Sequence, residues 1–593
     1  MYDYNCPDCN EAKLQSDKNA RKINEVIDQV NNLIQVNNET VDFIEEKAEE
    51  KVEEIAEIKV SEKLGDIKTS LDNIVQNSQL NILDFGAKQD GVTDNTEVFK
   101  KACATGRPIL VPNQNNMEYI ISERINITNN IVGVGYPKIR MKPKNSQTNI
   151  YDSGKSIIIQ VLNQSKDIII NGLHLIGNYD TIATTEHSHG IAISSTDNVK
   201  VFDNIIENTQ GDCIYVGNHS FTEGVEHIKD SCDNVKIYNN RLINPYRCCV
   251  ANVSTQNLII ENNYMNKKNN YVACIDNEPN IADNSLVFNT IIRNNNILVE
   301  NDTIAIHNYN ANNNVEHIFI KNNKIKSKGI GIRTSSAQAD YNIGRMIIQG
   351  NTFNCDKNGI SVGGMEKDEL IIKDNVDINN NGYGWITYGK DTIINGNIFK
   401  AKTKGKERLI FINCECVNSV SISDNTIKDV TGSDGAIVIN GSDGNKLEYV
   451  NIVNNTFNNC NKNIIIKNRG SNTTFSVNKL NISNNILYST DCCVYLYINV
   501  DELYMKNLYN GVGVKLRIGV SNTIGKRISD EAGIGNQDYC SDKIPTERTS
   551  FYGTFVRNTN ISVLGESGSK YVIVGWIMNQ ATGWEEVRCL VGK

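Results

Sequence analysis

A short pattern of hydrophobic and polar positions recurs along the middle of the chain. An apolar–any–apolar triplet is followed by a polar pair that ends in Asn, then by one residue and another apolar one. Examples are VFDNII, KIYNNRL, IIENNYM, IFIKNNKI and NISNNIL. The alternation and the β-branched residues predict strands, and the constant phrase between variable segments predicts a constant core with loops of different length.

The asparagines that end this phrase are regularly spaced. They are Asn204, Asn240, Asn263, Asn295, Asn323, Asn351, Asn375, Asn397, Asn425, Asn455 and Asn485. Their intervals average about 28 residues, and a repeat of this length is typical of solenoid proteins. A second strand-like phrase, such as DCIYV or ACIDN, falls in each repeat. The pattern predicts a mainly β chain folded as a parallel β-helix, with turns stacked ~4.8 Å apart and the asparagine amides forming a ladder. A leucine-rich solenoid would instead show a leucine consensus.

The two ends of the chain follow different patterns. Residues 18–79 have apolar residues spaced by three and four, which predicts a helical coiled-coil stalk after a tail at 1–17. The stretch Leu80–Cys103 predicts a strand, a turn and a helix that has Thr93 or Asp94 as N-cap and covers the open end of the β-helix. The β-helix is expected over 80–512, and a small C-terminal β domain for trimerisation or receptor binding over 513–593.

Composition narrows the range of partners. The net charge is −9, which argues against nucleic-acid binding, and no apolar run approaches the ~20 residues that span a bilayer. The N-terminal residues do not resemble a signal peptide, so we expect no membrane partner. Several of the 16 cysteines lie in apolar strand-like runs, where they are expected to be small buried hydrophobic residues: Cys213, Cys248, Cys249, Cys274, Cys492 and Cys493. Cys6 and Cys9 form a CxxC without further metal ligands nearby.

Two acids stand close together in the segment YVACIDNEPN. Asp276 and Glu278 are two residues apart, so in a strand they share a face at about 6–7 Å. Four repeats can be aligned on inward residues, taken as Ile191, Ile214, Cys249 and Ile275. This alignment places His189, Asp212 and Arg247 in one outward column, with Asn252 and Glu278 in another.

These side chains suggest a catalytic cluster. Asp212, Asp276 and Glu278 are candidates for general acid and base. The predicted substrate-binding residues are His189, Arg247, Tyr215 and His307. No cofactor is predicted, although a divalent metal on the acids and His189 would suit a phosphodiester substrate. The alternative is a set of solvated side chains with an Asp212–Arg247 ion pair worth less than ~1 kcal/mol.

The stretch NILDFGAKQDGVTDNTEVFKKA carries a resemblance to a known family. Its matching residues are Asp84, Gly86, Asp90, Gly91, Asp94 and the helix Thr96–Ala102. They closely resemble the opening motif of the pectate-lyase-like superfamily, the right-handed parallel β-helix of phage tailspikes and polysaccharide-degrading enzymes. The resemblance covers about residues 79–510. A coiled coil ahead of this motif is similar to phage tailspikes and pre-neck appendage proteins.

The resemblance implies a function as well as a fold. Such proteins are homotrimeric virion components, assembled in the host cytoplasm and attached to other tail or neck proteins through the N-terminal region. They bind and often cleave host glycopolymers, so hydrolysis of wall teichoic acid or capsular polysaccharide is expected here. A non-catalytic adhesin and a polysaccharide lyase, which would need a Lys or Arg base and a uronate with Ca²⁺, remain alternatives.

Overall fold

The structure is a computed structural model of the 593-residue chain. Its chain divides into two units, Met1–Gln79 and Leu80–Lys593. The described residues are 79–142, 156–163, 165–179, 187–219, 221, 231–280, 285–310, 315–336, 342–363, 366–380, 385–387, 391–401, 408–414, 417–441, 444–469, 475–510, 514–518, 524–528, 539–541, 555–558, 563–564, 571–579 and 583–590. The predicted tail and coiled-coil stalk, with Cys6 and Cys9, lie outside them.

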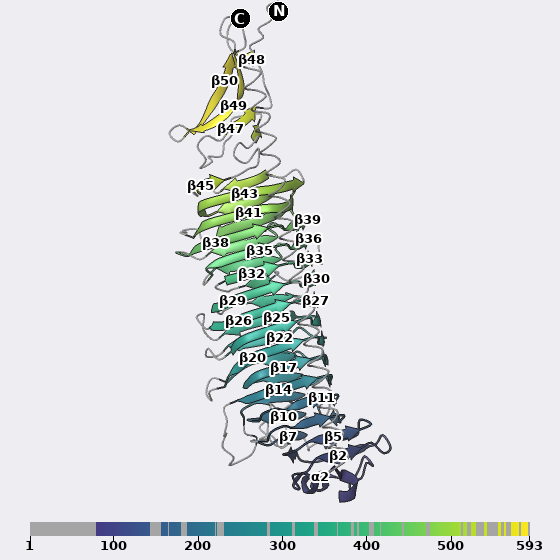
Figure 1. Cartoon of the computed structure of the whole chain (residues 1–593). Helices are drawn as coiled ribbons and strands as arrows, with labels where there is room; N and C mark the ends of the chain where they lie inside the picture. The colour runs from purple at the N-terminus through teal and green to yellow at the C-terminus, as the bar shows by residue number, and fades with distance from the viewer. Residues whose placement is uncertain are drawn as a thin grey trace, which may run out of the picture. The chain divides into compact units, whose positions relative to one another are not determined.

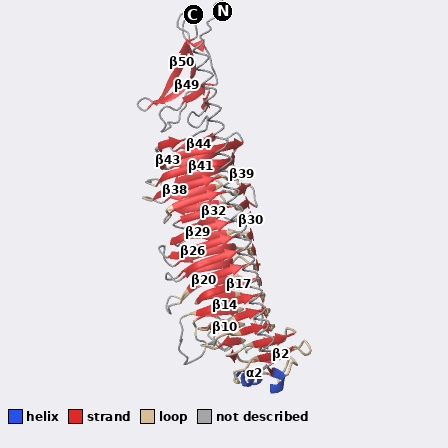
Figure 2. Ribbon diagram, viewed as in Figure 1, coloured by secondary structure: helices blue, strands red, loops and turns tan. Residues whose placement is uncertain are grey.

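Three stacks of parallel strands build the main body (Figure 1, Figure 2). The first strands of successive turns are β1 (Leu80–Asn81), β2 (Ile109–Pro112), β5 (Ile131–Val134), β8 (Ile169–Asn171), β11 (Lys200–Phe202), β14 (Cys232–Tyr238), β17 (Thr255–Glu261), β20 (Val287–Arg293), β23 (Val315–Lys321), β26 (Asn342–Gln349), β29 (Glu366–Lys373), β32 (Asp391–Asn395), β35 (Ser419–Ser423), β38 (Lys446–Val453), β41 (Ser476–Tyr488), β43 (Asn499–Asn510) and β45 (Ile524–Ile528). Strands of one stack pair in parallel along its whole length.

The second and third stacks complete each turn. The second contains β3 (Glu118–Ile121), β6 (Lys138–Met141), β9 (His174–Ile176), β12 (Ile205–Glu207), β15 (Arg241–Ile243), β18 (Tyr264–Lys267), β21 (Asn296–Val299), β24 (Lys324–Ser327), β27 (Thr352–Cys355), β30 (Val376–Asn380), β33 (Ile398–Ala401), β36 (Thr426–Lys428) and β39 (Thr456–Asn458). The third contains β4 (Ile125–Ile127), β7 (Ile159–Val161), β10 (Ile191–Ser194), β13 (Ile214–Gly217), β16 (Val250–Asn252), β19 (Ile275–Asn277), β22 (Ile304–Asn310), β25 (Ile330–Ser336), β28 (Ile360–Val362), β31 (Trp385–Thr387), β34 (Ile410–Cys414), β37 (Ile437–Gly441), β40 (Lys462–Asn468), β42 (Cys492–Tyr497) and β44 (Val514–Ile518). Strands make up 60% and helices 3% of the described residues, which confirms the mainly β class, and the stacking is that of a parallel β-helix.

The corner between the first and second strand explains the repeated phrase. The first residue of the polar pair has a positive φ, for example 56° at Asn262 and 54° at Asn322. Asn, Asp and Gly tolerate this left-handed conformation, which turns the chain sharply within one residue. The sequence therefore repeats a polar pair because the first member makes the bend and the second supports it.

The second member of the pair forms the predicted asparagine ladder. Asn323 accepts hydrogen bonds at Oδ1 from the Asn295 backbone N–H (3.0 Å) and from Asn295 Nδ2 (2.9 Å). Its Nδ2 donates to Asn351 Oδ1 (3.0 Å) and to two backbone carbonyls. Asn375, which fits the sequence phrase less well, makes the same contacts, and Asn507 adds one further step.

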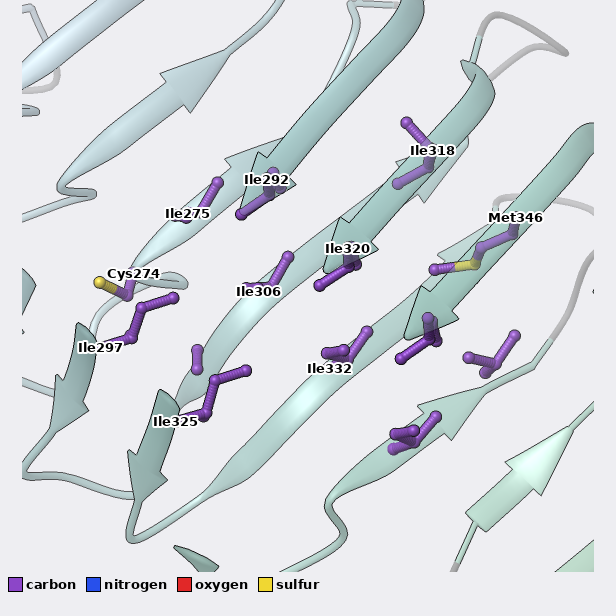
Figure 3. Packing of buried hydrophobic residues seen from close by; sticks show 14 of the residues in the cluster. Cys274, Ile275, Ile292, Ile297, Ile306, Ile318, Ile320, Ile325, Ile332 and Met346 are labelled. Carbon is purple, nitrogen blue, oxygen red and sulfur yellow. The ribbon is translucent and has the colours of Figure 1, made fainter. Parts of the chain in front are cut away.

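The interior is filled by aliphatic side chains aligned along the axis. Figure 3 shows Ile275, Ile306 and Ile332 from the third stack beside Ile292 and Ile320 from the first. These five are fully buried. The predicted role of the strand cysteines is confirmed, because Cys213, Cys248, Cys249, Cys274, Cys492 and Cys493 are buried and free.

A short helical segment closes the N-terminal end of the β-helix. The 3-10 helix η1 (Ile82–Phe85) and the helix α2 (Thr96–Cys103) bury Ile82, Phe99 and Ala102 in the core. The expected N-cap was wrong: α2 is preceded by Asn95, whose side chain does not cap it. The Asp94 carboxylate instead accepts from the Thr96 N–H (3.0 Å), so the acid supports the first turn from one position further out.

Parallel pairing continues past residue 512, the expected end of the β-helix. β44 pairs with β42, and β45 pairs with β43. A separate five-stranded sheet contains β46 (Tyr539–Ser541), β47 (Phe555–Asn558), β48 (Val563–Leu564), β49 (Tyr571–Asn579) and β50 (Gly583–Leu590). Pairs that involve β49 are antiparallel.

Among the described residues, no helix has the length and hydropathy required for a membrane span.

Candidate functional site

The predicted site residues gather on the outer face of the third stack. Its inward positions are occupied by isoleucine and valine in register: Ile191, Ile214, Val250, Ile275 and Ile306. The next residue of each strand points to the other face and belongs to one column: Ala192, Tyr215, Ala251, Asp276, His307 and Arg333. Side chains of successive turns are therefore neighbours at the strand spacing of ~4.8 Å.

The alignment predicted from the sequence was wrong by one residue in one turn. It assigned to Cys249 the position that Val250 occupies. The N–H groups of Cys249 (2.8 Å) and Val250 (3.2 Å) both donate to the Cys274 carbonyl oxygen, so this turn carries an extra residue before β16. Asn252, expected outward, consequently points inward, where its Nδ2 donates to Asn277 Oδ1 (2.7 Å).

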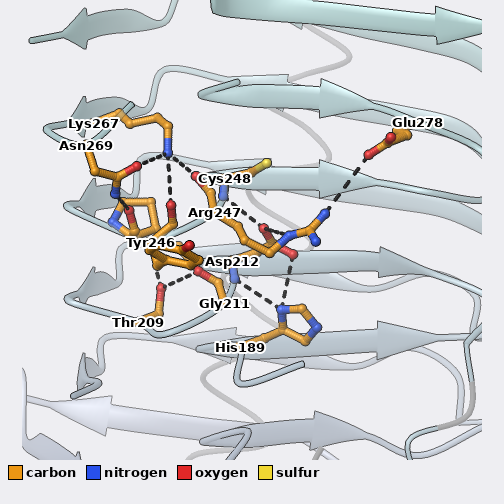
Figure 4. Close-up of polar contacts among 12 residues, drawn as sticks. His189, Thr209, Gly211, Asp212, Tyr246, Arg247, Cys248, Lys267, Asn269 and Glu278 are labelled. Atoms are coloured by element: carbon orange, nitrogen blue, oxygen red, sulfur yellow. Dashed lines mark hydrogen bonds and ion pairs between the residues drawn. The ribbon is translucent and has the colours of Figure 1, made fainter. Parts of the chain in front are cut away.

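Asp212 is the most enclosed member of the cluster, at 1% exposure. Its Oδ1 accepts from the Cys248 N–H (2.9 Å) and lies 3.6 Å from Arg247 Nε. Its Oδ2 lies 3.1 Å from His189 Nδ1. The predicted grouping of His189, Asp212 and Arg247 is thus present in the structure despite the shifted register (Figure 4).

Arg247 connects this group to Glu278. Its Nη2 lies 4.0 Å from Glu278 Oε2, and Figure 4 shows the guanidinium between Asp212 and Glu278. The Arg247 side chain is 13% exposed, whereas that of Glu278 is 46% exposed. The arginine therefore fixes a positive charge at the bottom of the cluster, and Glu278 stands at its solvent side.

Glu278 has the electrostatics of a proton donor. Burial, followed by the charge of Asp276, raises its pKa from 4.5 to about 7. Arg247 and His307 act in the opposite direction, and Asp212 adds to the increase. A carboxyl group with such a pKa carries its proton near neutral pH, as general acid catalysis requires.

Asp276 is paired with His307 on the next turn. Asp276 Oδ1 lies 2.9 Å from His307 Nδ1, and the acid is 2% exposed. The other ring nitrogen, His307 Nε2, lies 2.8 Å from Ser335 Oγ on the turn after that. Asp276, His307 and Ser335 therefore form a continuous hydrogen-bonded chain along the outer face.

The aromatic residues form two groups beside the cluster. Tyr215 is 7% exposed and stacks on the His189 ring, with centroids 4.9 Å apart. Tyr246 stacks on Tyr271 at 4.7 Å, and Tyr271 is 44% exposed. Tyr215 thus packs within the wall of the site, while Tyr271 presents an aromatic surface to solvent.

Lys267 and Ser335 were not identified from the sequence. Lys267 is fully buried, and its Nζ donates to the carbonyl oxygens of Tyr246 and Arg247 and to Asn269 Oδ1 (3.0 Å). These contacts hold the segment that carries Arg247 (Figure 4). The sequence does contain a signal for Lys267, since it stands two residues after the inward Met265 of β18. Ser335 has no comparable signal and is found only from the register of β22 and β25.

A bound metal ion would require several His, Cys, Asp or Glu side chains close together within the described residues. No group of three or more His, Cys, Asp or Glu side chains in these segments is placed to hold one ion. The acids of the cluster are instead paired with His189, Arg247 and His307.

The chain is similar to several solved structures. The Dettilon tailspike protein shares 13% sequence identity at a TM-score of 0.40, covering 63% of this chain and 69% of that chain. The pre-mature bacteriophage phi29 gene product 12 shares 12% at 0.37, covering 89% and 85%. The exopolygalacturonase from Thermotoga maritima shares 13% at 0.33, covering 72% and 92%. No family model matches the chain, and no curated protein matches it.

The neighbours include the kinds of phage protein that the sequence resembles, a tailspike and a phage gene product. At these identities and scores, the comparison assigns neither a substrate nor a reaction to this chain.

Proposed function

We propose that this protein is a phage tail spike or appendage that binds and hydrolyses a host cell-surface glycopolymer, wall teichoic acid or capsular polysaccharide. The observation that carries this proposal is Glu278, a solvent-reaching carboxyl group whose pKa is raised to about 7 beside the buried carboxyl of Asp276. Two carboxyl groups with different environments are the usual machinery of glycoside hydrolysis.

In this proposal the three acids have different roles. Glu278 donates its proton to the leaving oxygen. Asp276 accepts a proton from the attacking water through Oδ2, since Oδ1 is engaged with His307. Residues i and i+2 of an extended chain are about 6–7 Å apart, and this spacing of Asp276 in β19 and Glu278 just after it lies near the lower limit for an inverting reaction. Asp212, enclosed by His189, Arg247 and the Cys248 N–H, is a positioning residue.

Arg247 favours a substrate that carries negative charge. A guanidinium binds carboxylate or phosphate through paired hydrogen bonds, and both groups occur in capsular polysaccharides and teichoic acids. Tyr271, exposed next to this segment, supports the proposal with a surface on which a sugar ring can stack. The proposed assembly is a homotrimer attached to other tail or neck proteins of the virion through residues 1–79.

A binding-only adhesin is the second candidate. The observation that favours it is the burial of Asp212 and Asp276, at 1% and 2% exposure, since a base must reach the attacking water. An adhesin would use Glu278 and Arg247 as hydrogen-bonding groups for sugar hydroxyls and anionic substituents.

The deciding experiment is incubation of the purified full-length protein with cell walls, purified wall teichoic acid and capsular polysaccharide, followed by mass spectrometry. We expect fragments of defined mass from the wild type and from Glu448→Gln, an exposed carboxylate on β38. Glu278→Gln should retain binding and lose at least ~100-fold in turnover, the contribution of a general acid. Binding without fragments would establish the adhesin, and an unsaturated, ultraviolet-absorbing product would establish a lyase. Parallel reactions with EDTA test whether a metal takes part.

A further inference from the structure

Asp276, His307 and Ser335 occupy three successive turns of the third stack. β19, β22 and β25 pair in register, with Asp276 opposite His307 and Tyr309 opposite Ser335. The contacts are 2.9 Å from Asp276 Oδ1 to His307 Nδ1 and 2.8 Å from His307 Nε2 to Ser335 Oγ. The geometry is that of a carboxylate–imidazole–hydroxyl relay.

The hydrogen-bonding roles follow from the acid. An ionised carboxylate only accepts, so the shared proton resides on His307 Nδ1. In a neutral imidazole the other nitrogen then carries a lone pair, and the Ser335 hydroxyl donates to Nε2. This tautomer prepares Nε2 to remove the serine proton, which is the arrangement used by serine hydrolases.

The side chains become more exposed from the acid towards the serine, as a nucleophile that must reach a substrate requires. The side chain of Asp276 is 3% exposed and that of His307 is 17% exposed. Ser335 is partly exposed at the other end of the relay. The orienting acid is thus buried, and the nucleophile is the group that a substrate can reach.

We propose that Ser335 is the nucleophile of a second activity, the hydrolysis of carboxylic esters, with His307 as general base and Asp276 as the orienting acid. The substrate class is an O-acyl group on a sugar or polyol hydroxyl. The chemistry does not depend on the proposed glycopolymer hydrolysis; only the choice of an O-acylated glycopolymer as the natural substrate rests on it.

The reaction consumes one water and balances in two steps. Ser335 Oγ attacks the ester carbonyl while its proton moves to His307 Nε2. The C–O bond to the sugar breaks, and the departing oxygen takes that proton, which leaves an acyl-serine. Water then attacks the acyl carbonyl, gives its proton to Nε2, and Ser335 Oγ leaves with that proton, so the products are an alcohol and a carboxylic acid.

Arg333 is the candidate group for the negative charge that develops on the carbonyl oxygen. It is exposed, lies two residues before Ser335 on β25, and stands opposite His307 in the outward column. Residues i and i+2 of a strand share a face at about 6–7 Å, which a guanidinium side chain can span. A cation placed there would stabilise the tetrahedral intermediate.

The test uses p-nitrophenyl acetate and a fluorophosphonate label on the full-length protein. We expect the label on Ser335 by peptide mass mapping, and a loss of at least ~10³-fold in ester hydrolysis in Ser335→Ala, as for other catalytic serines. His307→Gln should lower hydrolysis and labelling together. Ser361→Ala is the matched control, since Ser361 lies opposite Arg333 on the next turn and should keep the wild-type rate.

The same variants distinguish ester hydrolysis from the proposed hydrolysis of the glycopolymer chain. Loss of ester hydrolysis in Ser335→Ala with unchanged fragmentation of the polymer chain supports a second activity, which shares Asp276 with the proposed chain cleavage but has its own nucleophile. Unlabelled Ser335, or ester hydrolysis equal to wild type in Ser335→Ala, overturns the proposal whatever the result for chain cleavage. A circular dichroism spectrum and melting curve like those of the wild type ensure that the comparison concerns folded protein.

Discussion

Replacing Glu278 with Gln should stabilise the protein in a pH-dependent manner. The folded-state pKa of about 7 exceeds the unfolded value of 4.5, so the protonated side chain favours folding. This contribution is complete below pH 4.5 and is lost as the pH rises through about 7, where ionised Glu278 must remain beside Asp276. A neutral Gln does not ionise and keeps the contribution at all pH values.

The size of the effect follows from the pKa and the exposure. The difference between 4.5 and about 7 corresponds to at most ~3 kcal/mol above pH 7. Because 46% of the side chain is exposed, water screens the charge, and we expect about 1–2 kcal/mol. For a chain of 593 residues, whose unfolding entropy is about 1.2 kcal/mol/K, that is an increase of roughly 1–2 °C in apparent Tm.

Thermal unfolding at pH 4 and pH 8 measures this directly. Glu278→Gln should melt with the wild type at pH 4 and above it at pH 8, while the exposed-site control Glu448→Gln should match the wild type at both. Equal differences at the two pH values, or a lower Tm at pH 8, would refute the electrostatic account of Glu278. The same variant lacks the proton donor, so it should be more stable and less active.

Three further predictions test the scaffold. Asn323→Ala removes all five side-chain hydrogen bonds of one ladder amide and leaves the Asn295 N–H buried without its acceptor. The free energy of local opening should therefore fall by about 4 kcal/mol, which corresponds to ~10³-fold faster exchange of backbone amides in the neighbouring turns, measured by mass spectrometry. Lys267→Met removes the ammonium group that contacts two backbone carbonyls and should release the segment that carries Arg247. The affinity for an anionic glycan, measured by calorimetry, should fall about 10-fold, while the Tm stays within a few degrees of the wild type. Phe99→Ala should create a cavity under the cap helix α2 that lowers the free energy of unfolding by about 3–5 kcal/mol, measured as a lower Tm. It should also expose the end of the sheet, measured as aggregation by light scattering.

The solenoid could be predicted because its repeat has a local physical cause. A residue at positive φ, followed by an asparagine whose amide joins the ladder, appears in the sequence as a polar pair ending in Asn. Each asparagine aligned from the sequence lies in the ladder. The cap helix was also visible from its pattern. Its N-cap was not, because Asp94 and Asn95 are both polar residues suited to a helix start, and only the folded structure distinguishes them.

The site was harder to predict because it depends on register between turns. One extra residue before β16 shifted the expected alignment, so that Asn252 turned inward. The group formed by Asp212, Arg247 and Glu278 survived this error because long side chains span a one-residue shift. The contact of His307 with Ser335 joins residues 28 apart, and no spacing rule within one strand could have indicated it.

The asparagine corners also separate what is fixed in this molecule from what can vary. Successive ladder residues are 22 to 36 positions apart, yet their amides remain 2.8–3.1 Å from one another. Additional residues between two corners are therefore compatible with an unchanged register on either side. An interval as long as the one from Asn204 to Asn240 shows that a turn can accept more than a dozen extra residues. The molecule can thus be treated as a display scaffold, in which the recognition surface is exchanged one segment at a time, by evolution or by design, while the hydrogen-bonded axis stays the same.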